Sequence, residues 1–183
     1  NRPGDFCMIS AEHPDWFLLD SNGRRITSGT DDSYVLMDPG HPGWRAFWLE
    51  RARLSQEEYG WEGVFLDNVE ASLSKREQGS AMPAAYPDDA SYLSAIEGFL
   101  SYLSSTYFRP NGRPLYANIV YFKYLAPYWR FLRHLDGVMD EGWGVGWTDE
   151  YRQPAIWDAE LRRVEQTQAL GKQVVLVAPG QYQ

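Results

Sequence analysis

The chain has 183 residues, of which 44% are hydrophobic, and a formal net charge of −8 from 25 acidic and 17 basic side chains. The apolar residues suffice for a packed core, but no apolar run approaches the roughly 18 residues of a membrane-spanning helix. Because an acidic chain without a basic patch is poorly matched to the nucleic-acid backbone, we expect neither a membrane nor a nucleic acid as partner.

The N-terminal part is predicted to contain short strands. Residues 5–10 form an apolar run typical of a buried strand, and residues 34–38 form another. Between them, residues 15–27 consist of two runs separated by Asn22-Gly23, a pair typical of hairpin turns.

Residues 39–60 are predicted to form a long helix. Pro42 suits its first turn, and Gly60 suits its end. Trp44 and Trp48 recur along this helix with other apolar side chains at helical spacing, so we expect both rings to fill the core.

From residue 63 onward, apolar strands alternate with helices. In chain order we predict a strand at 63–67, a long loop at 73–88, a helix at 88–108, a strand at 115–121, a helix at 124–135, a strand at 136–143, a helix at 153–171 and a strand at 173–180. The strands are continuous apolar runs, which is typical of a parallel sheet buried on both faces. Two architectures fit this pattern, a doubly wound open sheet and a (β/α)8 barrel.

The absence of a glycine-rich phosphate loop favours the barrel, because open nucleotide-binding sheets usually carry such a motif. A whole barrel typically needs about 250 residues. We therefore predict an α/β fold in which residues 1–183 form a single, partial (β/α)8 TIM barrel that lacks the first strands and the last. The chain starts at Asn1 without an initiator methionine, so we expect it to be part of a larger domain.

Polar side chains stand where the predicted strands end, which is where barrels carry their chemistry. The residues at or near these predicted strand ends are Asp38, Asp67, Asn68, Tyr116, Asn118, Asp140, Glu141 and Trp143. Two of these strand ends, separated by one βα unit, carry carboxylates that could face each other across a site.

A pair of carboxylates is what glycoside hydrolysis requires, one as acid and the other as nucleophile or base. Asp67 fits one role, and either Asp140 or Glu141 fits the other; the sequence does not choose between these two. Structural roles compete with this interpretation, since Asp67 could cap the following segment and the other two could pair with arginines. Asp38 lies in a turn-like "DPGHP" stretch, and we list it as a substrate-binding candidate.

Aromatic residues make up 15% of the chain, with 8 Trp and 12 Tyr. Large rings commonly fill cores, but they also serve as flat apolar platforms for sugar faces. Trp143 and Trp147 lie in a glycine-rich loop, which makes them better candidates for sugar stacking than the helical tryptophans.

Three segments together resemble hypothetical glycosyl hydrolase family 15: "HPDWFLLDSNGRRI", "YVLMDPGHPGWRAFWLERA" and "GWEGVFLDNVEAS". Polygalactosaminidase-like barrels share a similar "GVFLDN" strand and stay in consideration. The resemblance implies a glycosidase-like (β/α)8 barrel that acts on an oligosaccharide or polysaccharide.

A more distant similarity to α-galactosidase-type barrels implies roles for individual residues. Those barrels use an aspartate ending the fourth strand as nucleophile and an acid ending the sixth. On this basis Asp67 would be the nucleophile, Asp140 or Glu141 the acid, and the "LYANI" strand the fifth. Asn68 would orient Asp67 or bind a sugar hydroxyl, and Tyr116 and Asn118 would also bind substrate.

Two other functions compete with a glycoside hydrolase. One is a catalytically inactive carbohydrate-binding barrel, in which the carboxylates only bind hydroxyls. The other is a metal-dependent hydrolase or lyase, against which the three scattered histidines (His13, His41 and His134) and the single Cys7 argue. We expect neither metal nor cofactor. The sugar, the oligomeric state and the compartment stay open.

Overall fold

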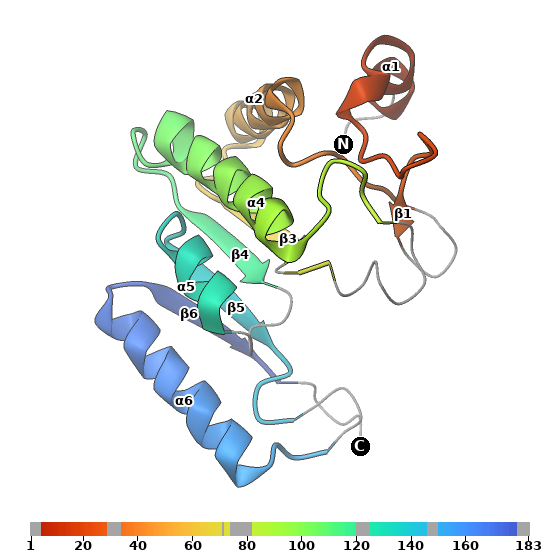
Figure 1. Cartoon of the computed structure of the whole chain (residues 1–183). Coiled ribbons are helices and arrows are strands. Elements are labelled where there is room, and N and C mark those ends of the chain that lie inside the picture. Colours follow the sequence, from red (N-terminus) through yellow and green to blue (C-terminus); the bar gives the residue numbers. More distant parts are fainter. Residues whose placement is uncertain are drawn as a thin grey trace, which may run out of the picture. The chain divides into compact units, whose positions relative to one another are not determined.

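Figure 1 shows the computed structural model of the chain, which describes residues 5–28, 34–70, 72–73, 82–119, 125–145 and 150–178. The chain divides into two compact units. The first comprises Asn1–Trp61 and Ser72–Leu103, and the second comprises Glu62–Ala71 and Ser104–Gln183. Among the described residues, no helix combines the length and the apolar character needed to cross a membrane.

The first unit consists of helices, turns and one short antiparallel pair of strands. Its elements are α1 (Asp5–Glu12), the 3-10 helix η1 (Pro14–Trp16), β1 (Thr27–Ser28), β2 (Tyr34–Val35), α2 (Pro42–Tyr59) and α4 (Asp89–Leu103). Buried Ile9, Trp16, Phe17 and Trp44 form a hydrophobic cluster, against which partly buried Trp48 packs. Both helical tryptophans of α2 therefore contribute to the core, as predicted.

The predicted strand at residues 5–10 is wrong, because these residues lie in α1. Periodicity cannot separate a short apolar strand from a short helix, so tertiary contacts decide. The buried Asp5 carboxylate accepts a hydrogen bond from Arg51 at 2.7 Å, and Ile9 is buried one turn later. In a strand Cys7 would face the same side as these two residues, but Cys7 is exposed, as helical geometry requires.

The predicted helix at residues 39–60 is confirmed as α2, which begins at Pro42. The His41 side chain caps it, since its Nδ1 accepts a hydrogen bond from the Gly43 N–H at 3.1 Å. Gly60 ends the helix in the left-handed conformation, with φ of 72°. Both helix signals in the sequence therefore act as predicted.

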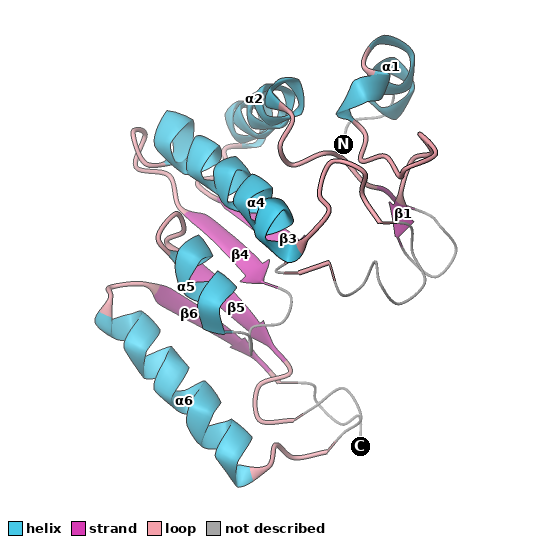
Figure 2. Ribbon diagram, in the orientation of Figure 1, coloured by secondary structure: helices cyan, strands magenta, loops and turns pink. Residues whose placement is uncertain are grey.

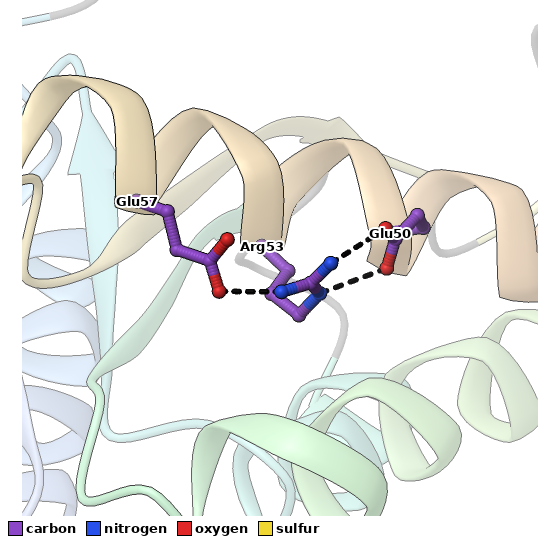
Figure 3. A network of polar contacts seen from close by, with 3 residues as sticks. All are labelled: Glu50, Arg53 and Glu57. Atoms are coloured by element: carbon purple, nitrogen blue, oxygen red, sulfur yellow. Dashed lines mark hydrogen bonds and ion pairs between the residues drawn. The ribbon is translucent and has the colours of Figure 1, made fainter.

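A three-residue ionic network lies along α2 (Figure 3). Arg53 donates to both carboxylate oxygens of Glu50, at 2.9 and 2.7 Å, and also to Glu57 one turn later. The hydrogen bond from Arg53 lowers the pKa of Glu50, and the same bond raises the pKa of Arg53. Because these groups are open to water, the network stabilises the helix only weakly.

The second unit contains a four-stranded parallel sheet with the strand order β3-β4-β5-β6 (Figure 2). Its strands are β3 (Val64–Val69), β4 (Leu115–Ile119), β5 (Gly137–Glu141) and β6 (Gln173–Val177), and its helices are the π-helix η2 (Ser104–Phe108), α5 (Leu125–Leu132) and α6 (Pro154–Ala169). The predicted alternation of helices with parallel strands is thus confirmed, and the fold is mixed α/β.

One face of this sheet forms the core of the second unit. The strand register places Leu66, Ala117 and Val138 side by side on that face, and all three are buried. Helix α5 crosses in front of the sheet in Figure 1. Its fully buried Tyr128 forms a hydrogen bond with Thr167 of α6, which joins the two helices over this face.

The opposite face differs from the prediction that the sheet is buried on both sides. Phe65, Tyr116 and Val175 point to this face, and the side chains of Phe65 and Val175 are 45% and 46% exposed. A parallel sheet needs a second layer on each face to bury every side chain. Helices α5 and α6 supply that layer on the Ala117 face only.

The hydrogen bond between Tyr128 and Thr167 has a defined direction, which predicts unequal effects of two substitutions. The Thr167 hydroxyl donates to the Arg163 carbonyl at 2.7 Å, so the Tyr128 hydroxyl must donate to Thr167. We expect Tyr128→Phe to lower the free energy of unfolding by about 1 kcal/mol. Thr167→Val removes the acceptor of a buried hydroxyl and should cost more, up to about 3 kcal/mol. Urea titration measures both values, and a smaller loss for Thr167→Val would contradict the direction of the bond.

Candidate active site

Polar side chains from three adjacent strands meet at the carboxyl-terminal edge of the sheet. They are Asp67 and Asn68 of β3, Asn118 of β4 and Glu141 of β5. Because the three strands are parallel neighbours, their ends lie at the same edge. These four residues are called the strand-end group below.

Asn118 is the centre of the strand-end group. Its buried side-chain nitrogen donates to Asp67 Oδ1 at 3.1 Å and to Glu141 Oε2 at 2.9 Å. The two carboxylate oxygens are therefore no more than about 6 Å apart, and about 5 Å apart if each accepts one of the two amide N–H bonds. Asp67 and Glu141 are themselves exposed, so both carboxylates are open to water.

Asp67 is fixed further by its neighbour Asn68. The backbone N–H of Asn68 donates to Asp67 Oδ1 at 2.8 Å, and the Asn68 side-chain amide donates to Oδ2 at 3.1 Å. Asn68 has a φ of 53°, a left-handed conformation that asparagine tolerates better than most residues. The strand register also shifts between Leu66 and Val69, so this irregularity turns the backbone amide toward the carboxylate.

Asp140 and Glu141 point to opposite faces of β5, because successive strand residues alternate. Asp140 is buried on the helix-covered face, near Arg163 of α6 and Tyr128 of α5. Burial lowers the pKa of Arg163, and the carboxylates of Asp140 and Glu160 oppose that shift. Burial also raises the pKa of Tyr128 to about 12, with a smaller contribution from Asp140. The structure therefore groups Glu141, and not Asp140, with Asp67.

Tyr116 shares the face of Asn118 but lies two residues earlier in β4. Its ring lies directly over Gly137 of the neighbouring strand, where a Cβ atom would clash with it. The Tyr116 hydroxyl donates to the Gln173 side chain of β6. Tyr116 thus sits one layer below the strand-end group, and its predicted contact with substrate stays a prediction.

Trp143 follows Glu141 in the loop between β5 and α6. Its ring packs against Trp157 of α6, with ring centroids 4.9 Å apart. Sequence reasoning did not select Trp157, because a tryptophan in a helix is usually a core residue. The candidate Trp143 in the preceding loop, on which Trp157 packs, was the one signal in the sequence that could have pointed to Trp157. Trp147 lies outside the described residues.

Asp38 belongs to the first unit and stabilises the turn that leads into α2. Its carboxylate accepts hydrogen bonds from the Gly40 N–H, at 2.7 Å, and from the Tyr86 hydroxyl. Burial and the bond to Asp38 raise the pKa of Tyr86 well above its ordinary value. These contacts give Asp38 a structural role, and sugar binding by this residue stays a prediction.

No group of three or more His, Cys, Asp or Glu side chains in the described part of the chain could hold a metal ion. The strand-end group itself offers two carboxylates and two amides. Such groups can transfer a proton, attack an electrophilic carbon or bind hydroxyls.

Comparison with protein families gives a match over nearly the whole chain. A family model described as hypothetical glycosyl hydrolase family 15 matches residues 2–182, which include every strand and the whole strand-end group. No curated protein matches the chain. The resemblance identified from the three sequence segments is confirmed.

Proposed function

Since this chain belongs to hypothetical glycosyl hydrolase family 15, we propose that it hydrolyses glycosidic bonds of an oligosaccharide or polysaccharide, with Asp67 and Glu141 as the catalytic pair. The observation that carries this proposal is the Asn118 amide, which donates to both carboxylates at 3.1 and 2.9 Å. A buried amide that holds two exposed acids at one sheet edge supplies the constellation that glycoside hydrolysis needs.

The four parallel strands are, in this proposal, consecutive strands of a (β/α)8 barrel formed by a single domain. Two features support it. The helices α5 and α6 lie on one face of the sheet, as the outer ring of a barrel does. The other face carries apolar side chains such as Phe65 and Val175, which suit a barrel interior.

Asp67 is assigned as the nucleophile and Glu141 as the general acid. Three N–H groups hold the Asp67 carboxylate in one orientation, which suits attack on an anomeric carbon. Glu141 accepts one hydrogen bond from Asn118 among the described residues, so its carboxyl group can move to protonate a leaving oxygen. Asn118 and Asn68 position the pair.

The reaction then proceeds in two steps. Glu141 gives its proton to the glycosidic oxygen while Asp67 attacks the anomeric carbon, which forms a glycosyl ester and releases the first sugar. Glu141, now a base, removes a proton from a water molecule that cleaves the ester. A separation of about 5–5.5 Å between the carboxyl groups is typical of this retaining course, and the Asn118 geometry fits it.

A single experiment tests both the activity and its stereochemistry. The chain is incubated with α- and β-linked tetrasaccharides of glucose, galactose, mannose and xylose, and the first product is followed by proton NMR. We expect one linkage to be cleaved with retention of the anomeric configuration. Cleavage with inversion would refute the nucleophile assignment. Tight binding without cleavage would instead indicate that the chain is a catalytically inactive carbohydrate-binding barrel.

A further inference from the structure

A pair of tryptophan rings follows the strand-end group on the side of β5 and β6. Trp143 stands two residues after Glu141, and Trp157 stands in the first turn of α6. Their ring planes are inclined at 47°, with centroids 4.9 Å apart, and Trp157 is 36% exposed. Together the two rings offer a partly exposed apolar surface, and aromatic rings of this kind can bind the apolar face of a sugar.

The backbone that carries Trp143 is held by hydrogen bonds to neighbouring segments. The N–H groups of Gly142 and Trp143 both donate to the Val177 carbonyl at the end of β6, at 2.8 and 2.9 Å. Arg152 donates through its side chain to the Gly142 carbonyl at 3.2 Å, and through its backbone to the Gly144 carbonyl at 3.0 Å. A ring on a hydrogen-bonded backbone loses little conformational entropy when a ligand binds to it.

Gly144 allows the second ring to approach this loop. It has a φ of 73°, which favours glycine, and a Cβ atom at this position would lie 3.2 Å from the Trp157 ring. The Trp157 side chain therefore packs against the loop backbone as well as against Trp143. The two packed rings are called the tryptophan pair below.

We propose that the tryptophan pair binds the leaving-group sugar, an inference that rests on the proposed hydrolysis. The sheet order β3-β4-β5-β6 places Asp67, Asn118, Glu141 and then the loop of Trp143 in sequence along one edge. The nucleophile attacks the sugar that stays on the protein, whereas the acid protonates the oxygen that leaves. The sugar beyond Glu141 is therefore the leaving group, and the pair stands on that side.

This placement fixes the direction of the substrate across the sheet edge. The sugar that forms the ester lies over β3, and the departing sugar lies over β5 and β6. The rings offer apolar surface to a sugar face, whereas the carboxylates and amides of the strand-end group contact the reacting centre. Remote contacts of this kind contribute to kcat/KM only for substrates whose leaving group reaches them.

The test compares two substrates that differ in the leaving group. One is the tetrasaccharide that the whole chain cleaves, and the other is the glycosyl fluoride of the same sugar, which has no leaving-group sugar. We expect Trp143→Leu and Trp157→Leu each to lower kcat/KM for the tetrasaccharide by about tenfold, and to change it for the fluoride less than about twofold. Leucine keeps apolar bulk for folding but lacks the ring.

Two control variants test whether any loss of activity comes from the loss of the aromatic ring. Trp157→Phe retains a ring and should keep most of the tetrasaccharide activity. Leu161→Ala shortens a side chain of similar exposure, 38%, one turn further along α6. It should leave kcat/KM for both substrates unchanged. Far-ultraviolet circular dichroism of every variant checks that the fold is intact.

The outcomes separate this inference from the function on which it rests. Equal losses on both substrates, or no loss on either, would overturn the assignment of the tryptophan pair while leaving hydrolysis intact. If the unchanged chain cleaves neither the tetrasaccharides nor the fluorides, the proposed hydrolysis itself fails.

Discussion

Asp67→Asn should lower kcat by at least about a thousandfold, because the amide that replaces the carboxylate cannot attack the anomeric carbon. Asparagine keeps the size of the side chain and one oxygen that can accept from the Asn68 backbone N–H and from Asn118, and it loses only the bond from the Asn68 side-chain amide, so the fold should be retained. Glu141→Gln should be comparably inactive on tetrasaccharides, whose leaving alkoxide needs a proton. The measurement is the initial rate of tetrasaccharide cleavage at saturating substrate.

The two variants should differ on a substrate that needs no acid. Glycosyl fluorides expel fluoride without protonation, so Glu141→Gln should still form the glycosyl ester of Asp67 on them. Mass spectrometry would then detect the chain with one sugar attached. Asp67→Asn should show no such adduct. Full hydrolysis of tetrasaccharide by Asp67→Asn, or an adduct on a residue other than Asp67, would remove this residue from the mechanism.

Asp140→Ala should instead act on stability, with an expected loss of about 3–5 kcal/mol in the free energy of unfolding. The Asp140 carboxylate is buried on the helix-covered face, where it opposes the desolvation of Arg163. Its removal leaves the buried guanidinium with less compensating charge, and Glu160 is the remaining acid near Arg163. Urea unfolding followed by fluorescence measures the loss.

A double variant provides the control for this prediction. Asp140→Leu combined with Arg163→Met removes both charges together, and replacing interacting buried charges by apolar side chains is often neutral or better. We expect the double variant to recover most of the stability that Asp140→Ala loses. An Asp140→Ala chain that is as stable as the original but cannot cleave tetrasaccharide would make Asp140, and not Glu141, the acid.

The alternation of strands and helices could be predicted from the sequence, because the residues that indicate each element lie within that element. Residues 63–66 are a continuous run of small and apolar side chains, and Val64 to Leu66 proved to lie in β3 of a parallel sheet. Pro42 and Gly60 likewise mark the ends of α2 through their own backbone preferences. Local signals failed at residues 5–10, where a helix is fixed by the distant Arg51.

The candidate site was only partly accessible from the sequence. Strand ends predicted that Asp67, Asn118 and one acid of β5 would share an edge, since parallel strands end together. Alternation also places Asp140 and Glu141 on opposite faces, but it does not say which of the two shares the face of Asn118. That depends on the register of Asn118 with Met139, which puts Glu141, two residues further, on the face of Asn118.

The sequence by itself therefore determined the family, the order of helices and strands, and the polar residues that close each strand, because these depend on residue type and spacing along the chain. The tertiary structure alone decided that one Asn118 amide joins Asp67 to Glu141, and that Trp157 of α6 packs on Trp143. Both contacts join residues from different elements, and their geometry depends on how strands and helices pack, which no local pattern encodes.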